Sequence, residues 1–340
     1  MNKWYEQGGP DSDAVVSNGI CLSRNLREYP FPVRMKRLDC AAVTKLVLNA
    51  AANAGDRVLS QLRFLDLAQM SDEENVSLVE RQMASPELIF EPEGRGLLFS
   101  EDESVSILLN AENHVQLRVN AAGLNLEGAY RSADELDSFL DKTLHFAFDE
   151  SLGYLTQNPA NLGTGLCASL VLHLPALKES GSTAHLSASL LRLGITLRAF
   201  GGAGAEPGGA FFQLSNRMSL GLSEQEAISN LRTLAMQIIV QERAAREELA
   251  EKIEIQDMVL RSLGILKSAR ILPDDEFMQL ISNVRFGVFA GILPDLDYKL
   301  LDKLAVELQP ATLMAFSGKT LKTAERNAAR SRMVQEVLNH

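Results

Sequence analysis

The sequence predicts an α+β domain followed by a helical domain. Up to about residue 255, short apolar runs of strand length alternate with segments of helical spacing. Beyond that point few strand patterns occur, and the chain is interrupted at Gly264, Pro273, Pro294 and Pro310. A chain of 340 residues, 46% hydrophobic and 23% charged, can bury one large core or two ordinary ones. We therefore expect domains at residues 1–255 and 256–340.

Hydrophobic spacing and capping residues define the elements of the first domain. The expected strands are 15–26, 62–67, 96–100, 105–109, 166–174, 195–200 and 212–216. The expected helices are 36–52, 71–83, 132–148, 182–193 and a long one from residue 223. Capping boxes of the form Ser-x-x-Glu begin the helices at Ser71, Ser132 and Ser223.

Composition narrows the classes of function. A formal net charge of -11 and a pI near 5.1 argue against general nucleic-acid binding, which needs clustered Lys and Arg. The N-terminus lacks the apolar core of a signal peptide, and no run of about 18 apolar residues occurs. We expect a cytoplasmic protein without membrane attachment.

Cysteine and histidine usage indicates neither a disulfide framework nor a metal site. Cys21, Cys40 and Cys167 are odd in number and widely spaced, so we expect free, buried thiols. The five histidines show no metal-ligand spacing.

The chain is organised around residues 158–177. A turn at Pro159 and a Gly163-Thr164-Gly165 step, which allows close backbone approach to a ligand, lead into the apolar run 166–174. This pattern favours a ligand-facing loop feeding a core strand. The alternative is an ordinary turn before an ordinary strand, since glycine pairs are common in turns.

The sequence of residues 158–177 resembles the central signature motif of the ATP:guanido phosphotransferases, most closely that of the McsB-type protein arginine kinases. Their motif reads C-P-T-N-x-G-T-G-x-R-A-S, followed by a strand ending in H-L-P-A-L. Residues 23–26, 79–86, 110–118 and 198–217 also resemble family motifs. The resemblance implies a phosphagen-kinase-like antiparallel sheet flanked by helices, with Mg-ATP as the nucleotide. It also implies a helical C-terminal domain that dimerises.

When the family's site residues are matched to this sequence one by one, the resemblance implies that only a few of them are retained. Glu112 matches the carboxylate that orients the guanidinium and takes its proton, and Arg198 matches a phosphate-binding arginine. The other family positions are substituted: arginines by Gly19, Cys21, Gln116 and Cys167, a nucleotide-contacting histidine by Gln82, the active-site cysteine by Asn158, and a second catalytic carboxylate by Ala203.

These substitutions predict that phosphotransfer has been lost and that the protein acts by binding, as an adaptor or regulatory partner. Phosphoryl transfer depends on positioned charges around three phosphates, and arginines supply them best. The alternative is an active kinase that phosphorylates protein arginines, with a phosphate site rebuilt from Arg24, Arg118, Arg198 and Arg217. A purely structural dimer is a third hypothesis.

The last predicted helix carries a second candidate site. Arg326 and Arg330, four residues apart, share one helix face and resemble the family's phosphoarginine-reading motif R-D-x-x-R-A, with Asn327 in place of the aspartate. The alternative is a solvated basic helix. The partners that the resemblance implies are a second copy of the chain, phosphoarginine-bearing proteins and a bacterial AAA+ protease, in a proteostasis setting.

Overall fold

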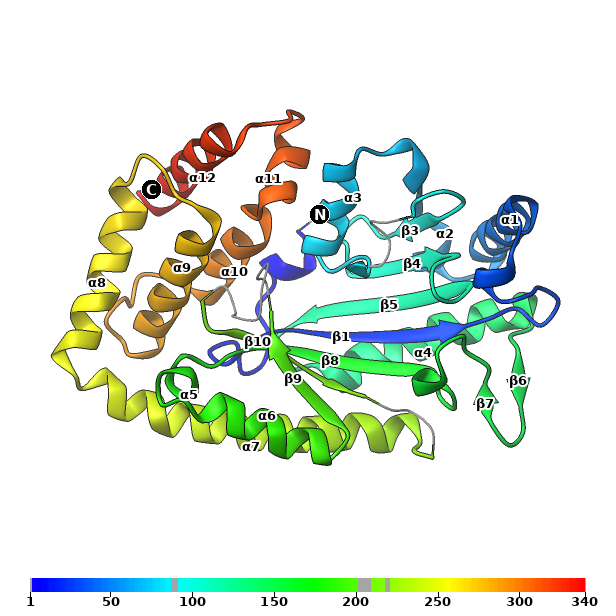
Figure 1. The fold of residues 1–340 in the computed structure, drawn as a ribbon, viewed down its shortest axis with the longest axis horizontal. Coiled ribbons are helices and arrows are strands. Elements are labelled where there is room, and N and C mark those ends of the chain that lie inside the picture. Colours follow the sequence, from blue (N-terminus) through cyan, green and yellow to red (C-terminus); the bar gives the residue numbers. More distant parts are fainter. Residues whose placement is uncertain (1, 87–90, 201–208, 218–220, 340) are drawn as a thin grey trace.

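The computed structural model describes residues 2–86, 91–200, 209–217 and 221–339. It contains one eight-stranded, antiparallel sheet, with the strand order β2-β3-β4-β5-β1-β8-β10-β9 (Figure 1). In that order the strands are β2 (Arg63–Asp66), β3 (Gly96–Phe99), β4 (Val105–Leu109), β5 (Val115–Ala122), β1 (Val15–Arg24), β8 (Leu166–His173), β10 (Phe211–Asn216) and β9 (Ile195–Ala199). The expected antiparallel sheet flanked by helices is confirmed.

Helices cover one face of the sheet and surround its ends. The helices of this region are α1 (Arg37–Asn53), α2 (Arg57–Ser60), α3 (Asp72–Glu80), α4 (Leu126–Leu144), α5 (Pro175–Glu179), α6 (Ser182–Arg192) and α7 (Glu224–Ala250). The main core lies between the sheet and α1, α4 and α7, where alternate strand residues such as Ile20, Leu117 and Leu170 are buried.

Beyond α7 the described chain is helical, as the sequence predicts. The helices are α8 (Ile253–Ser268), α9 (Asp274–Phe289), α10 (Tyr298–Glu307), α11 (Pro310–Ser317) and α12 (Thr323–Leu338). They form a second core and lie beside one end of the sheet, with α11 against α3 (Figure 1). The division into domains at 255/256 stays a prediction.

The expected capping boxes form at two of the three serines. The hydroxyls of Ser71 and Ser223 accept from the backbone N–H of Glu74 and Glu226, both at 3.2 Å. The helix expected at Ser132 instead begins six residues earlier, at Leu126, and ends at Leu144. Phe148, expected on its buried side, lies in the short hairpin of β6 (Phe148–Asp149) and β7 (Gly153–Tyr154) and is half exposed.

A buried ionic network joins the sheet to α7 and the C-terminal helices. Arg246 is fully buried, and its Nε donates to Glu242 Oε1 at 2.7 Å while Nη2 donates to the His173 backbone carbonyl. The Glu242 carboxylate accepts from two N–H groups at the start of α5, and His173 Nε2 lies 2.9 Å from Ser282 Oγ on α9. Burial and the neighbouring cations Arg246 and Arg285 keep the His173 pKa well below its ordinary value. The imidazole therefore stays neutral.

Candidate functional site

The strand register brings the substituted family positions onto one face of the sheet. Cys21 on β1 stands opposite Cys167 on β8 and Arg118 on β5, and Gly19 stands opposite Ser169. Because strand side chains alternate, these residues face away from the core that buries the residues between them. Ser23 on the same face stands opposite Gln116. The positions 19, 21, 116 and 167 thus form one surface, which we call the site face.

Neutral amides and hydroxyls make up most of the site face. Asn120 donates from Nδ2 to the backbone carbonyl of Gln82 at 2.9 Å, and the Gln82 side chain lies 3.4 Å from Ser17 Oγ. Gln82 therefore lies at the edge of this surface. Gln116 is 9% exposed, and its Oε1 has no hydrogen-bond partner among the described residues. It leaves an unused acceptor at a position where the family resemblance places an arginine.

Charged groups still act electrostatically on the thiols of this face. Arg118, the buried Arg24 and Glu112 act on Cys21, and Arg118 and Arg198 act on Cys167. Glu112 is half buried, and its Oε2 lies 3.4 Å from the Asn161 amide. The structure therefore brings Glu112 and Arg198, the two residues that the resemblance marks as retained, to the same region.

The expectation that all three thiols are buried is wrong. Cys21 and Cys40 are half buried, and Cys167 is exposed; all three are free. Desolvation by the surrounding sheet nevertheless raises the pKa of Cys21, and it raises that of Cys167 to about 11. At neutral pH both site-face thiols are therefore protonated and neutral.

The loop before β8 approaches β1 closely, whereas the approach to a ligand expected from the glycine pattern stays a prediction. Gly165 has a φ of +64°, and a Cβ there would lie 2.6 Å from the Ser23 carbonyl oxygen, so only glycine fits. The Asn158 side chain accepts from the Ala160 N–H at 3.0 Å and caps the short helix Pro159–Asn161. Asn158 therefore has a local structural partner.

Arg24 cannot join a rebuilt phosphate site, contrary to the expectation for the active kinase. It lies on the opposite face, is 2% exposed, and donates from Nε and Nη2 to Asp137 Oδ2 on α4 at 3.0 and 2.8 Å. Nη1 donates to the Thr164 carbonyl, and the guanidinium stacks on Tyr154. Arg217 is exposed, and Ala203 lies outside the described residues.

The structure places the two arginines of the predicted phosphoarginine site in different environments. Arg330 is fully buried, and its guanidinium donates to the carbonyls of Leu308 and Leu272, both at 2.8 Å, and reaches Asp274 at 3.2 Å. Arg326 is half exposed, and its Nε has no partner in the described part of the chain. The phosphoarginine site stays a prediction, in which Arg326 is the accessible residue.

This arrangement gives a prediction about stability. Arg330→Met should lower the free energy of unfolding by about 2 kcal/mol or more, because two buried carbonyls would lose their donors. Arg326→Met should change it by less than about 1 kcal/mol. Chemical denaturation of both variants tests this, and equal midpoints would contradict the structural role of Arg330. Only Arg326→Met can then report on phosphoarginine binding without a loss of folding.

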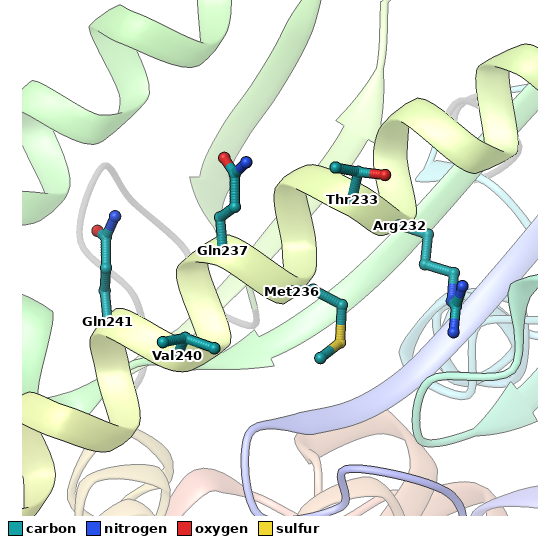
Figure 2. A pocket seen from close by; sticks show the side chains of 6 residues that line it. All are labelled: Arg232, Thr233, Met236, Gln237, Val240 and Gln241. Atoms are coloured by element: carbon teal, nitrogen blue, oxygen red, sulfur yellow. The ribbon is translucent and has the colours of Figure 1, made fainter.

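A surface pocket lies on α7, away from the site face. Figure 2 shows a groove on α7 lined by Arg232, Thr233, Met236, Gln237, Val240 and Gln241. It holds none of the sequence-predicted site residues. No group of three or more metal-ligating side chains, and no helix long and apolar enough to cross a membrane, occurs among the residues that the structure describes.

Sequence reasoning missed two features of this region. The charged residues of the long helix from residue 223 gave no sign of burial, yet Glu242 and Arg246 are fully buried. Sequence reasoning also treated Cys21 and Cys167 as separate substitutions, although β1 and β8 place them opposite each other. The sequence around each cysteine has a strand pattern, which was the available signal for their proximity. Their pairing, however, depends on the register between two strands, which one strand alone does not specify.

Comparison with known proteins agrees with this geometry. Among solved structures, lombricine kinase superposes with a TM-score of 0.62 at 22% identity, covering 72% of this chain and 70% of that one. The duplicated taurocyamine kinase of Schistosoma mansoni gives 0.62 at 21% identity, over 80% of this chain and 40% of that one. At such identities the likeness shows the fold, which is that of a guanidino kinase.

Comparison with protein families identifies the chain more specifically than the fold does. The ATP:guanido phosphotransferase C-terminal catalytic domain matches residues 42–245, and the protein-arginine kinase McsB C-terminal domain matches residues 252–340. Protein-arginine kinases of Symbiobacterium thermophilum and Halothermothrix orenii are 40% and 39% identical, over 99% and 100% of this chain and 97% of each relative. The chain belongs to the ATP:guanido phosphotransferase family, in its McsB-type protein-arginine kinase branch.

Proposed function

We propose that this chain acts by binding, as an adaptor or regulatory partner, and has lost efficient phosphotransfer. The observation that carries the proposal is the neutral site face, where Gly19, Cys21, Gln116 and Cys167 stand together at four positions for which the family resemblance implies arginines. The strands that build this face are neighbours in one continuous sheet. The scaffold is therefore kept while charge is missing at these four positions.

The chemistry of the remaining groups fits Mg-ATP poorly. Phosphoryl transfer proceeds mainly through alignment and through neutralisation of charge on the phosphates. Arg118 and Arg198 are the described arginines close to the site-face thiols, and Arg24 is committed to Asp137. Loss of one positioned donor typically costs about 3 kcal/mol of transition-state stabilisation, so several losses leave little activity even when they are not additive.

The binding role includes partners that follow from the family. A homodimer, a phosphoarginine-bearing protein and a AAA+ protease of bacterial proteostasis, all in the cytoplasm, are the partners of this proposal. Their support is the resemblance together with the C-terminal family match at residues 252–340. A thermal-shift titration with free phosphoarginine tests the contact with a phosphoarginine-bearing protein.

An active kinase is the second candidate function, and one observation favours it. Relatives that are 36–40% identical over nearly the whole chain carry the name protein-arginine kinase. Sequence similarity to these relatives therefore favours kinase activity, whereas the uncharged residues of the site face argue against it. A kinase of this kind would rely on Glu112 as the base and on Arg118 and Arg198 at the phosphates.

One experiment separates the two. The full chain is incubated with Mg-ATP and an unstructured arginine-rich protein, phosphoarginine is measured by mass spectrometry, and ATP binding is measured by calorimetry. We expect no phosphoarginine and weak or absent binding, with the protein-arginine kinase of Symbiobacterium thermophilum as the positive control. Phosphoarginine that forms with this chain and disappears in Glu112→Ala would establish the kinase instead.

A further inference from the structure

Two free thiols stand directly opposite each other at the centre of the site face. Cys21 on β1 and Cys167 on β8 are register partners, and Cys167 is exposed. Cys21 also acts electrostatically on Cys167 and raises the pKa of that thiol. The third cysteine, Cys40, lies on α1, away from this pair.

The hydrogen bonding of the two strands sets their separation. The Ser23 N–H donates to the Gly165 carbonyl at 2.9 Å, and hydrogen-bonded pairs alternate along an antiparallel ladder. Cys21 and Cys167, two residues along each strand, therefore form another hydrogen-bonded pair. Such pairs have a Cα separation of about 5.5 Å, within the range that a disulfide spans.

We propose that Cys21 and Cys167 are a redox-sensitive pair that forms a reversible cross-strand disulfide when the protein meets a hydroperoxide. The Cβ atoms of a hydrogen-bonded pair lie farther apart than those of most disulfides, so the bond would be strained. Strained and exposed disulfides are reduced readily by thiols. This inference does not depend on whether phosphotransfer is kept or lost.

The reaction balances with a hydroperoxide as the oxidant. The exposed Cys167 thiolate attacks one peroxide oxygen, the O–O bond breaks, and the leaving hydroxide takes up a proton to give water. Cys167 is then a sulfenic acid, oxidised by two electrons. The Cys21 thiolate attacks that sulfur, the S–O bond breaks, and the leaving hydroxide takes up a proton to give a second water. Two thiols and one hydrogen peroxide thus give one disulfide and two waters.

The charges around the pair determine how its rate depends on pH. Desolvation and Glu112 oppose the Cys21 thiolate while Arg118 and Arg24 favour it, and desolvation by the surrounding strands raises the pKa of Cys167 to about 11 despite Arg118 and Arg198. The thiolate is the reactive form. The oxidation should therefore be slow at pH 7 and should accelerate about tenfold per pH unit up to pH 9.

The full chain tests the proposal. It is treated with hydrogen peroxide at pH 8 under native conditions, and free thiols, intact mass and non-reducing peptide maps are measured. We expect loss of two thiols and two hydrogen atoms, a peptide joining β1 to β8, faster migration on a non-reducing gel, and full reversal by dithiothreitol. Because the bond joins distant residues, the unfolding temperature should rise on oxidation.

Matched serine variants control for the third thiol and for folding. Cys40→Ser should keep the disulfide, whereas Cys21→Ser and Cys167→Ser should each lose it and instead accumulate a sulfenic or further oxidised cysteine. The peptide map of the unsubstituted chain needs no variant, so a folding defect in one of them does not remove the test. A disulfide through Cys40, only intermolecular bonds, or oxidation of Cys21 and Cys167 without a bond between them would overturn the proposal.

Discussion

Arg246→Met is expected to lower the free energy of unfolding by about 3–5 kcal/mol. The methionine keeps the length of the side chain but leaves the Glu242 carboxylate buried without its cation, and both residues are fully buried. It also removes donors from the backbone carbonyls of His173 and Asp13. Denaturation followed by circular dichroism and by the fluorescence of Trp4, the single tryptophan, which packs beside α10, measures the loss.

A second arginine on α7 provides the control for Arg246→Met. Arg232 pairs with Glu127 on α4, but both side chains are more than half exposed, so Arg232→Met should cost at most about 1 kcal/mol. The double variant Glu242→Gln/Arg246→Met should cost less than the sum of its single changes, because the unpaired charge is gone. Equal effects of Arg246→Met and Arg232→Met would show that the buried network does not hold α7 to the sheet.

Introducing arginine at three positions of the site face should raise the affinity for Mg-ATP by at least about a hundredfold. The variant is Cys21→Arg/Gln116→Arg/Cys167→Arg, and each charge-assisted hydrogen bond to phosphate contributes about 1.5–3 kcal/mol. Gly19 is left unchanged because a Cβ there would meet the Asn120 amide oxygen at 2.9 Å. Calorimetry measures the affinity, and phosphoarginine formation should stay low because Asn158 and Ala203 remain.

The three introduced arginines should also lower the stability of the protein when no nucleotide is bound. The groups introduced at 21 and 167 stand directly opposite each other, and like charges in that position destabilise a sheet. The variant should therefore unfold at a lower temperature than the natural chain alone and recover when Mg-ATP is added. The neutral variant Cys21→Gln/Cys167→Gln is the matched control. Improved ATP binding in that control, or none in the arginine variant, would contradict the missing-charge explanation.

Local patterns predicted most elements of the fold. The strands at 105–109 and 166–174 and the long helix from Ser223 follow from apolar spacing and a capping box, which act over a few residues. The start of α4 was missed because Ser132-x-x-Glu135 has the form of a capping box, yet both residues lie exposed within the helix. Packing of Leu126 and Ala129 against the sheet extends the helix by nearly two turns beyond that signal.

By itself the sequence determined the family, the mixed α+β region and the helical region that follows it, because motifs and periodicity are local properties of a chain. Only the tertiary structure decided which groups contact one another. It assigned Arg24 to Asp137, buried Arg330 among backbone carbonyls, and set Cys21 against Cys167. The physical reason is that strand register and burial arise from contacts between residues far apart in the chain, and these fix which face and which partner each side chain has.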